Sequence, residues 1–104
     1  MLILNESNFD ESIAKGVSLV DFYADWCMPC RSLAPILEDL KLKMPSVNFF
    51  KLNIEDSQDL AGKYDVSSIP LMVIMRDGKE VNRIVGLMKS EDIEKKINEV
   101  LKVE

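Results

Sequence analysis

The chain has 104 residues, of which 47% are hydrophobic and 30% charged, so it is long enough for one domain with one hydrophobic core. Its net charge of −5, with Lys and Arg scattered along the sequence, argues against binding to the phosphate backbone of nucleic acids. The absence of histidine excludes Ser-His-Asp and Cys-His catalysis.

The apolar segments of the sequence are short. The longest runs over 69–75 and is far too short to cross a bilayer. Met1–Leu4 contains no basic residue and is followed at once by polar Asn5–Ser7, so a secretory signal peptide is not expected. With only two cysteines in the chain, these features predict a cytoplasmic protein without membrane association.

The first half of the chain alternates predicted strands and helices. Residues 1–4 form a short strand candidate, and 7–15 a helix that Gly16 stops. Residues 18–24 are apolar at nearly every position, as in a strand that is covered on both faces. Helical spacing of leucines and isoleucine predicts a helix over 31–43.

The second half continues with a strand, a short helix, a β-hairpin and a last helix. The two strands of the hairpin flank Arg76-Asp77-Gly78-Lys79, a turn sequence. Ser90 is expected to cap the last helix. The predicted ranges are 47–53, 58–64, 69–75, 81–85 and the segment after 90.

The element order is therefore β-α-β-α-β-α-β-β-α. Strands that are separated by helices imply right-handed parallel crossovers, whereas a hairpin adds antiparallel strands. The prediction is an α/β protein with a central mixed sheet and helices on both faces.

Cys27 and Cys30 are the only cysteines, and they lie where the second strand meets the second helix. Backbone N–H groups at the start of a helix favour a thiolate, which is the reactive form of cysteine. A C-x-x-C pair beside a βαβ pattern indicates a thioredoxin-like redox motif.

Five segments resemble the thioredoxin family in the order in which that family has them. Met28 stands where thioredoxins usually have glycine, and Leu71 where threonine is common. The resembling segments are the active-site signature at 20–31, the helix proline Pro35, the third strand at 51–55, the proline loop Ser68-Ile69-Pro70, and Val85-Gly86.

The resemblance implies a thioredoxin fold, a central mixed five-stranded sheet flanked by four helices, as a single domain over 1–104. It implies a thiol–disulfide oxidoreductase that reduces protein disulfides, is re-reduced by thioredoxin reductase and acts on disulfide-containing client proteins. A monomer with no bound cofactor and no metal is expected.

Several interpretations of the cysteine pair remain open from the residues alone. It could be a structural disulfide, although so small a loop stabilises the fold by only about 2 kcal/mol. It could be half of a zinc site that a second chain completes. Trp26 and Pro29 favour redox catalysis, with Cys27 as the attacking nucleophile nearer solvent and Cys30 as the more buried resolving thiol.

Asp21 is a lone carboxylate in an otherwise apolar strand. Burial is expected to raise its pKa, because a low-dielectric environment disfavours the charged form. The resemblance suggests that Asp21 exchanges a proton with Cys30, whereas a purely stabilising ion pair is the alternative. Lys51 is the expected partner, since its strand should lie beside that of Asp21.

The resemblance also predicts a cis Ile69–Pro70 bond, which leaves the Ile69 backbone free to pair with an extended substrate. Around Cys27 we expect an exposed apolar rim. Its members, which with Pro29 are the expected substrate-binding residues, are Trp26, Met28, Ile69, Pro70, Gly86 and Leu87.

Three other activities remain open. A disulfide oxidase or disulfide isomerase uses the same thiol–disulfide exchange, the oxidase to form substrate disulfides and the isomerase to rearrange them. A glutaredoxin-like protein usually carries another dipeptide between its cysteines. A non-catalytic docking subunit could use the fold as a scaffold, although the intact segment from Trp26 to Arg31 argues against this.

Overall fold

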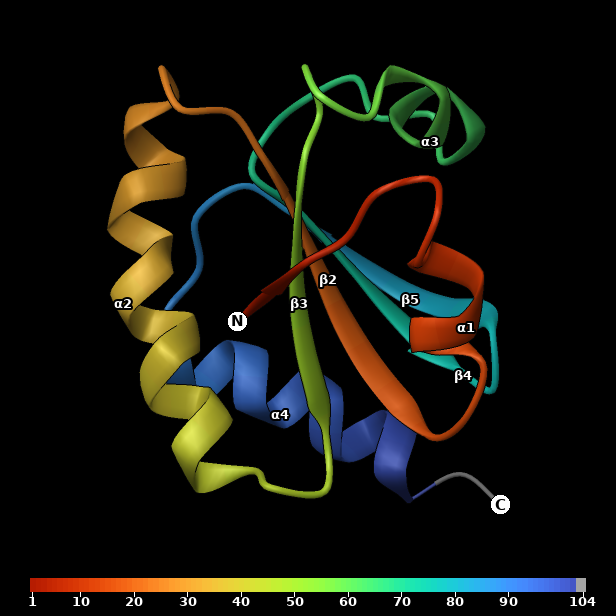
Figure 1. Ribbon diagram of the computed structural model, residues 1–104. Helices are drawn as coiled ribbons and strands as arrows, with labels where there is room; N and C mark the ends of the chain where they lie inside the picture. The colour runs from red at the N-terminus through yellow and green to blue at the C-terminus, as the bar shows by residue number, and fades with distance from the viewer. Residues whose placement is uncertain (103–104) are drawn as a thin grey trace.

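The computed structural model describes residues 1–102 and contains five strands and four helices (Figure 1). They follow one another as β1 (Leu2–Ile3), α1 (Phe9–Ile13), β2 (Val17–Tyr23), α2 (Met28–Lys43), β3 (Asn48–Asn53), α3 (Gln58–Lys63), β4 (Leu71–Arg76), β5 (Lys79–Val85) and α4 (Ser90–Leu101). The predicted element order is confirmed. The last two residues of the expected domain, 103–104, lie outside the described residues.

The five strands form one mixed sheet in the order β1-β3-β2-β4-β5. β1, β3 and β2 run parallel to one another, whereas β4 is antiparallel to β2, and β5 is antiparallel to β4. β2 is therefore a central strand, covered on both faces, which explains its nearly continuous apolar sequence.

Helices α2 and α4 cover one face of the sheet (Figure 1). Each presents residues at helical spacing to the core, and these are fully buried against the side chains of alternate strand positions such as Leu19 and Ile74. The buried helix residues are Leu33, Leu37, Leu40, Ile93, Ile97 and Val100.

Helices α1 and α3 cover the opposite face, which has its own core. Here the ring of Tyr64 lies between two phenylalanines, with its centroid 5.5 Å from that of Phe9 and 5.9 Å from that of Phe22. Tilted aromatic pairs at these separations add to the stabilisation from burial. Tyr64 therefore fixes the end of α3 to the sheet.

Boundaries of all four predicted helices differ from the structure, although α3 differs only in ending at Lys63 instead of residue 64. α1 is shorter than the expected 7–15, and α4 begins at Ser90 with Lys89, not Ser90, at the N-cap position. α2 begins at Met28, three residues before the predicted start at Arg31. Its second residue is Pro29, and a proline is tolerated in the first turn because the N–H that it lacks has no partner within the helix there.

The hairpin between β4 and β5 turns at Asp77 and Gly78, which both have positive φ angles of 49° and 85°. Two residues in this conformation match the twist of the flanking antiparallel strands. Among residues 1–102, no helix combines the length and the apolar character needed to cross a membrane.

Candidate redox-active site

Cys27 and Cys30 form a disulfide where β2 ends and α2 begins, with their Cα atoms 5.2 Å apart. Cys27 occupies the N-cap position of α2, and its Sγ accepts a hydrogen bond of 3.2 Å from the Cys30 N–H. The early start of α2 thus places Cys27 at the helix end, where unpaired N–H groups stabilise negative charge.

The two cysteines do not differ in exposure. Each is 4% exposed in the disulfide form. The exposed fractions therefore do not support the expectation that Cys27 lies nearer solvent than Cys30. They differ instead in surroundings: Cys30 lines a cavity next to Asp21, whereas Cys27 is not among the residues that line it. Cys30, in the first turn of α2, thus shares its cavity with the strand residues Asp21 and Lys51.

The loop before the disulfide is held by two hydrogen bonds. The Cys27 N–H donates to the Ala24 carbonyl at 3.2 Å, and the Arg31 Nε donates to the Asp25 carbonyl at 3.0 Å. Between these contacts Trp26 is 63% exposed. The loop is therefore fixed while its indole ring remains accessible beside Cys27.

The expected rim is only partly exposed. Met28 and Leu87 are 67% and 51% exposed, and Pro29 is exposed too. Ile69 and Gly86 are half-buried, and Pro70 is buried, so the expectation that Pro70 is part of the exposed rim is wrong. Pro70 directly precedes β4, a strand between β2 and β5 whose first five residues are buried, and it is buried together with them.

The Ile69–Pro70 peptide bond is cis, as expected from the resemblance. The Pro70 carbonyl accepts a hydrogen bond of 2.8 Å from the N–H of Gly86, whose φ of 89° favours glycine. Ile69 packs against the small cluster of Ala24, Cys27 and Cys30. Its backbone N–H and C=O make no backbone hydrogen bond with any described residue.

Asp21 is only 3% exposed, and its Oδ1 has no hydrogen-bond partner among residues 1–102. Burial raises the pKa of Asp21 from 3.8 to about 7, and the nearby charge of Lys51 opposes this rise. A carboxyl group with this pKa holds and releases a proton near neutral pH, which suits a general acid or base.

Lys51 lies directly beside Asp21 in the register of β3 and β2, as predicted. No direct ion pair joins the two side chains in the described part of the chain. The Lys51 Nζ instead lies over the ring of Tyr23, 5.5 Å from its centroid, in a cation–π contact. Lys51 therefore acts on Asp21 through its field, not through a hydrogen bond.

A cavity of about 300 Å³ connects these groups. It is bounded by β2 and β3 on one side and by one face of α2 on the other. The lining residues are Met1, Asp21, Tyr23, Ala24, Asp25, Cys30, Arg31, Ala34, Glu38 and Lys51. A carboxyl group with a raised pKa and the sulfur-bearing Cys30 thus open onto the same space, where water can carry a proton between them.

Sequence reasoning missed the α2 wall of this cavity. Arg31, Ala34 and Glu38 are spaced by three and four residues, so they lie on one face of the helix. The leucine and isoleucine spacing predicts the helix and its core side, but it does not indicate that the face with Arg31, Ala34 and Glu38 borders a cavity. Tyr23 also lines the cavity. Burial, and then the charges of Asp25 and other carboxylates, raise its pKa.

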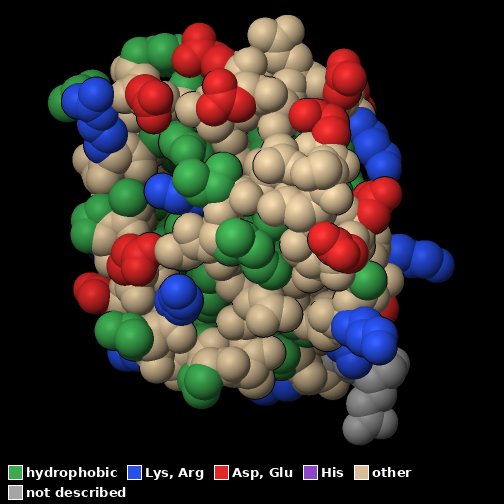
Figure 2. Space-filling view, viewed as in Figure 1, with side chains coloured by type: hydrophobic (Ala, Val, Ile, Leu, Met, Phe, Trp, Pro, Cys, Tyr) green, Lys and Arg blue, Asp and Glu red, His purple; other side chains and the backbone are tan. Residues whose placement is uncertain are grey.

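The edge of the sheet at which β2 and β3 end is acidic. Figure 2 shows Asp and Glu side chains gathered along the upper edge of this face. Asp25, Glu55, Asp56 and Asp59 are exposed in the segments that follow the two strands. No group of three or more His, Cys, Asp or Glu residues in the described chain is arranged to hold a metal ion.

A C-x-x-C disulfide at the start of a helix, with a buried carboxyl group behind it, defines a thiol–disulfide oxidoreductase. The sequence model of one family, described as thioredoxin, matches residues 1–99. The chain belongs to the thioredoxin family.

Relatives with that name cover nearly the whole chain. A thioredoxin of Chlamydia pneumoniae is 48% identical over 96 residues, which span 92% of this chain and 94% of the relative. A thioredoxin of Staphylococcus saprophyticus is 40% identical over 91 residues, or 86% and 88% of the two chains.

Solved structures agree with this assignment. A mutant thioredoxin of Halobacterium salinarum superimposes with a TM-score of 0.91 at 30% identity, covering 99% of this chain and 92% of that one. The thioredoxin of Fasciola hepatica gives 0.89 at 35% identity, covering 95% and 98%. The expected thioredoxin fold is confirmed, and the chain is a disulfide reductase with a redox-active disulfide.

Proposed function

We propose that Cys27 is the attacking thiol, that Cys30 resolves the mixed disulfide, and that Asp21 exchanges the proton of Cys30. The observation that carries this proposal is the position of the disulfide between two different surroundings. On one side lie exposed apolar side chains, and on the other lies the cavity with Asp21 and Lys51.

In the first step the Cys27 thiolate attacks one sulfur of a substrate disulfide. The substrate S–S bond breaks, a Cys27–substrate bond forms, and the first substrate thiolate leaves and takes up a proton. The helix N-terminus stabilises the Cys27 thiolate before attack.

In the second step Cys30 loses its proton to Asp21, and its thiolate attacks the Cys27 sulfur. The Cys27–Cys30 disulfide forms, and the second substrate thiolate leaves and takes up a proton from solvent. Two electrons have then passed from the dithiol to the substrate, and the two protons lost by Cys27 and Cys30 balance the two that the substrate thiolates take up. The pKa of about 7 lets Asp21 accept this proton and release it through the cavity at neutral pH. The charge of Lys51 keeps that pKa from rising further.

The exposed side chains of Trp26, Met28 and Leu87 receive the client protein, with Pro29 beside them. The half-buried Ile69, Gly86 and the buried Pro70 shape the adjoining loop. The free N–H and C=O of Ile69 pair with an extended client segment, because an unpaired backbone edge accepts one more strand. The acidic edge favours basic partner surfaces.

We also propose that residues 1–104 form a single domain that acts as a cytoplasmic monomer. Thioredoxin reductase supplies its electrons, and proteins with disulfides are its clients. The relatives named thioredoxin support these partners. Insulin reduction driven by NADPH and thioredoxin reductase is expected to be fast, and reduction driven by glutathione slow. The reverse preference would remove thioredoxin reductase as the electron donor.

The docking surface is tested with Leu87→Ser. Leu87 is exposed, so the variant is expected to fold normally and to raise the KM for insulin about threefold, through the loss of apolar contact area. The control is Leu42→Ser, at an 82% exposed leucine in the last turn of α2. Equal effects of the two substitutions would show that Leu87 is not part of a docking surface.

A further inference from the structure

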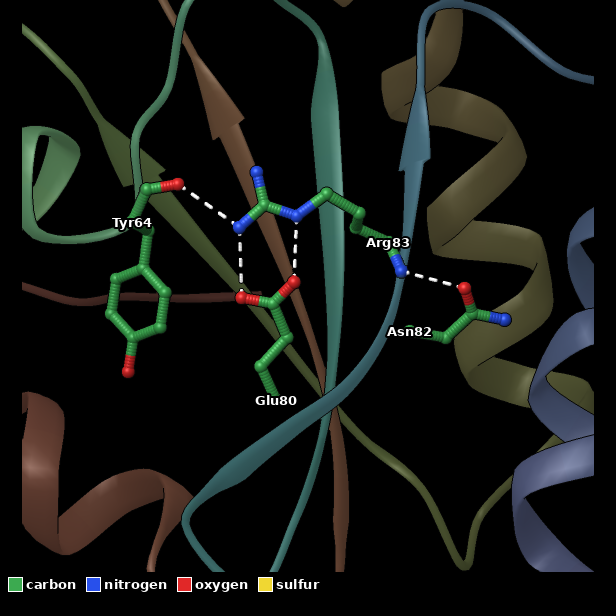
Figure 3. A network of polar contacts seen from close by, with 4 residues as sticks. All are labelled: Tyr64, Glu80, Asn82 and Arg83. Atoms are coloured by element: carbon green, nitrogen blue, oxygen red, sulfur yellow. Dashed lines mark hydrogen bonds and ion pairs between the residues drawn. The ribbon is translucent and has the colours of Figure 1, made fainter.

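Arg83, in the edge strand β5, makes three side-chain hydrogen bonds (Figure 3). Its Nε and Nη2 donate to the two carboxylate oxygens of Glu80 at 2.6 and 2.8 Å. The same Nη2 donates to the carbonyl of Tyr64 at 3.0 Å. We call these contacts the Arg83 network. It joins β5 to the residue at which α3 ends.

A bulge in β5 makes this network possible. Residues three apart in a regular strand point to opposite faces of the sheet. In the β4–β5 register Ile74 faces Asn82 and Met75 faces Glu80, so Val81 is an extra residue. The extra residue turns Glu80 to the face on which Arg83 lies, and the two side chains meet.

Tyr64 begins the loop that carries the proposed substrate-binding backbone. Its half-buried ring packs against Phe9 and Phe22, and the next residue, Asp65, has a φ of 51°. A non-glycine residue costs about 1 kcal/mol or more in this left-handed conformation, so the turn needs contacts that hold it. The Arg83 network holds the carbonyl just before this turn.

The other end of the loop is held by the residue that follows β5. The Gly86 N–H donates to the Pro70 carbonyl at 2.8 Å. Arg83, in β5, and Gly86, just after it, thus bond the two residues that flank the segment 65–69. Within that segment Ser67 and Ser68 are exposed, and Ile69 packs against the cysteine cluster.

We propose that Arg83 is a positioning residue for substrate binding: it fixes the start of the 65–69 loop so that the Ile69 backbone faces a client segment beside Cys27. This inference rests on the proposed docking role of Ile69. The alternative is that the network only stabilises the edge strand. Its side chains are 34% and 30% exposed, and ion pairs at such sites contribute little to stability.

The test is Arg83→Gln, which removes the Glu80 pair and the charge-assisted bond to Tyr64. The pre-reduced protein is oxidised either by insulin or by the small disulfide dithiobis-nitrobenzoate, with acid quench and thiol alkylation. We expect the KM for insulin to rise about fivefold, as for the loss of one backbone hydrogen bond to the substrate, with a nearly unchanged maximal rate. The rate with the small disulfide should be unchanged, because that reagent does not pair with the Ile69 backbone.

Two further variants make the result specific. Arg83→Lys keeps the charge but lacks the planar fork that binds both Glu80 oxygens and Tyr64, so its KM should lie between wild type and Arg83→Gln. Lys43→Gln breaks the 3.8 Å ion pair with Glu94 on the other face and should leave both reactions unchanged.

The proposal is overturned if Arg83→Gln slows both reactions equally, since the disulfide itself is then affected, or if it slows neither. Failure of the docking surface is distinguishable from failure of the Arg83 network. If Leu87→Ser raises the KM for insulin and Arg83→Gln does not, the surface stands and the role of Arg83 falls. If neither variant changes the KM, the docking surface itself is wrong.

Discussion

The two sides of the Cys27–Cys30 disulfide reverse the usual arrangement of a globular protein, in which large apolar side chains are buried and carboxyl groups are exposed. On the outer side Trp26 and Met28 expose large apolar side chains to water. On the inner side Asp21 is buried without a hydrogen bond to its Oδ1 from any described residue. Apolar groups thus lie outside and a carboxyl group inside.

Both the exposed apolar side chains and the buried carboxyl group cost stability, but each suits a different task. Burying exposed apolar surface under a client lowers the free energy, so the outer side suits the binding role that we propose. A buried carboxyl group has a pKa near neutrality, so the inner side suits the proposed proton transfer. Substitutions on the outer side should therefore change substrate affinity, and those on the inner side the pH dependence of rate and stability.

The largest effects are expected at the disulfide between the two sides. Cys27→Ser should abolish insulin reduction, because no nucleophile remains to attack the substrate. Cys30→Ser should instead accumulate a mixed disulfide with the substrate, visible by mass spectrometry as a covalent adduct. Normal turnover by Cys30→Ser would refute the assignment of Cys27 as nucleophile and Cys30 as resolving thiol.

Asp21→Asn should change how stability depends on pH. Between pH 3.8 and about 7 the folded protein holds a proton on Asp21 that the unfolded chain has lost, so the free energy of unfolding falls as pH rises through this window. The loss is about 4 kcal/mol for about three pKa units. Urea denaturation should find the Asn variant more stable than wild type at pH 8, with the advantage gone at pH 4.

The same variant should reduce insulin more slowly at pH 7, by on the order of a hundredfold if Asp21 carries the proton of Cys30. Asp59→Asn is the control, since that carboxylate is exposed on α3 and does not line the cavity. An unchanged rate in Asp21→Asn, despite the changed stability profile, would restrict Asp21 to a structural role.

Lys51→Gln should have a smaller effect of the opposite sign. Loss of the positive charge raises the pKa of Asp21 further above 7, so the pH–rate profile shifts to higher pH. The other charged groups that line the cavity, Asp25, Arg31 and Glu38, remain in place. Stability at pH 8 should fall by about 1 kcal/mol.

A matched lysine provides the control for this substitution. Lys63 lies over the ring of Tyr64, 5.8 Å from its centroid, much as Lys51 lies over Tyr23, but outside the cavity. Lys63→Gln should shift neither the profile nor the stability at pH 8. If the two variants behaved alike, Lys51 would not be tuning Asp21.

The fold and the inner side of the site were largely predictable from sequence. Apolar continuity in 18–24 identified a covered central strand, and a lone Asp21 within it had to be a buried carboxyl group with a raised pKa. The expectation that Lys51 lies beside Asp21 rested on the resemblance of its strand to the third thioredoxin strand, and the register confirms it. The central strand and the buried carboxyl group needed only periodicity and burial.

The remaining features depend on three-dimensional details that periodicity does not encode. The equal burial of the two cysteines and the burial of Pro70 depend on how loops close over the end of the sheet. The contact of Glu80 with Arg83 depends on a bulge, and three-residue spacing in a strand gave no reason to expect it. Lys51 also lies over the ring of Tyr23, so, within residues 1–102, the purely stabilising ion pair that was the alternative interpretation of Asp21 does not form with it.

Met28 should give the smallest effect, on the outer side. It occupies the first position of α2 and is 67% exposed, where the resemblance leads us to expect glycine. Met28→Gly should lower stability by about 0.5 kcal/mol through helix propensity. It should also raise the KM for insulin about twofold, through the loss of apolar area.

Met28→Ala distinguishes the two causes, because alanine favours the helix but lacks the apolar bulk. If both variants raise the KM equally, the side chain acts by contact with the client, as the outer side of the comparison requires. If only Met28→Gly does so, backbone freedom next to Cys27 is responsible, and Met28 acts on the nucleophile rather than on binding. Unchanged kinetics in both variants would limit the apolar docking surface to Trp26 and Leu87.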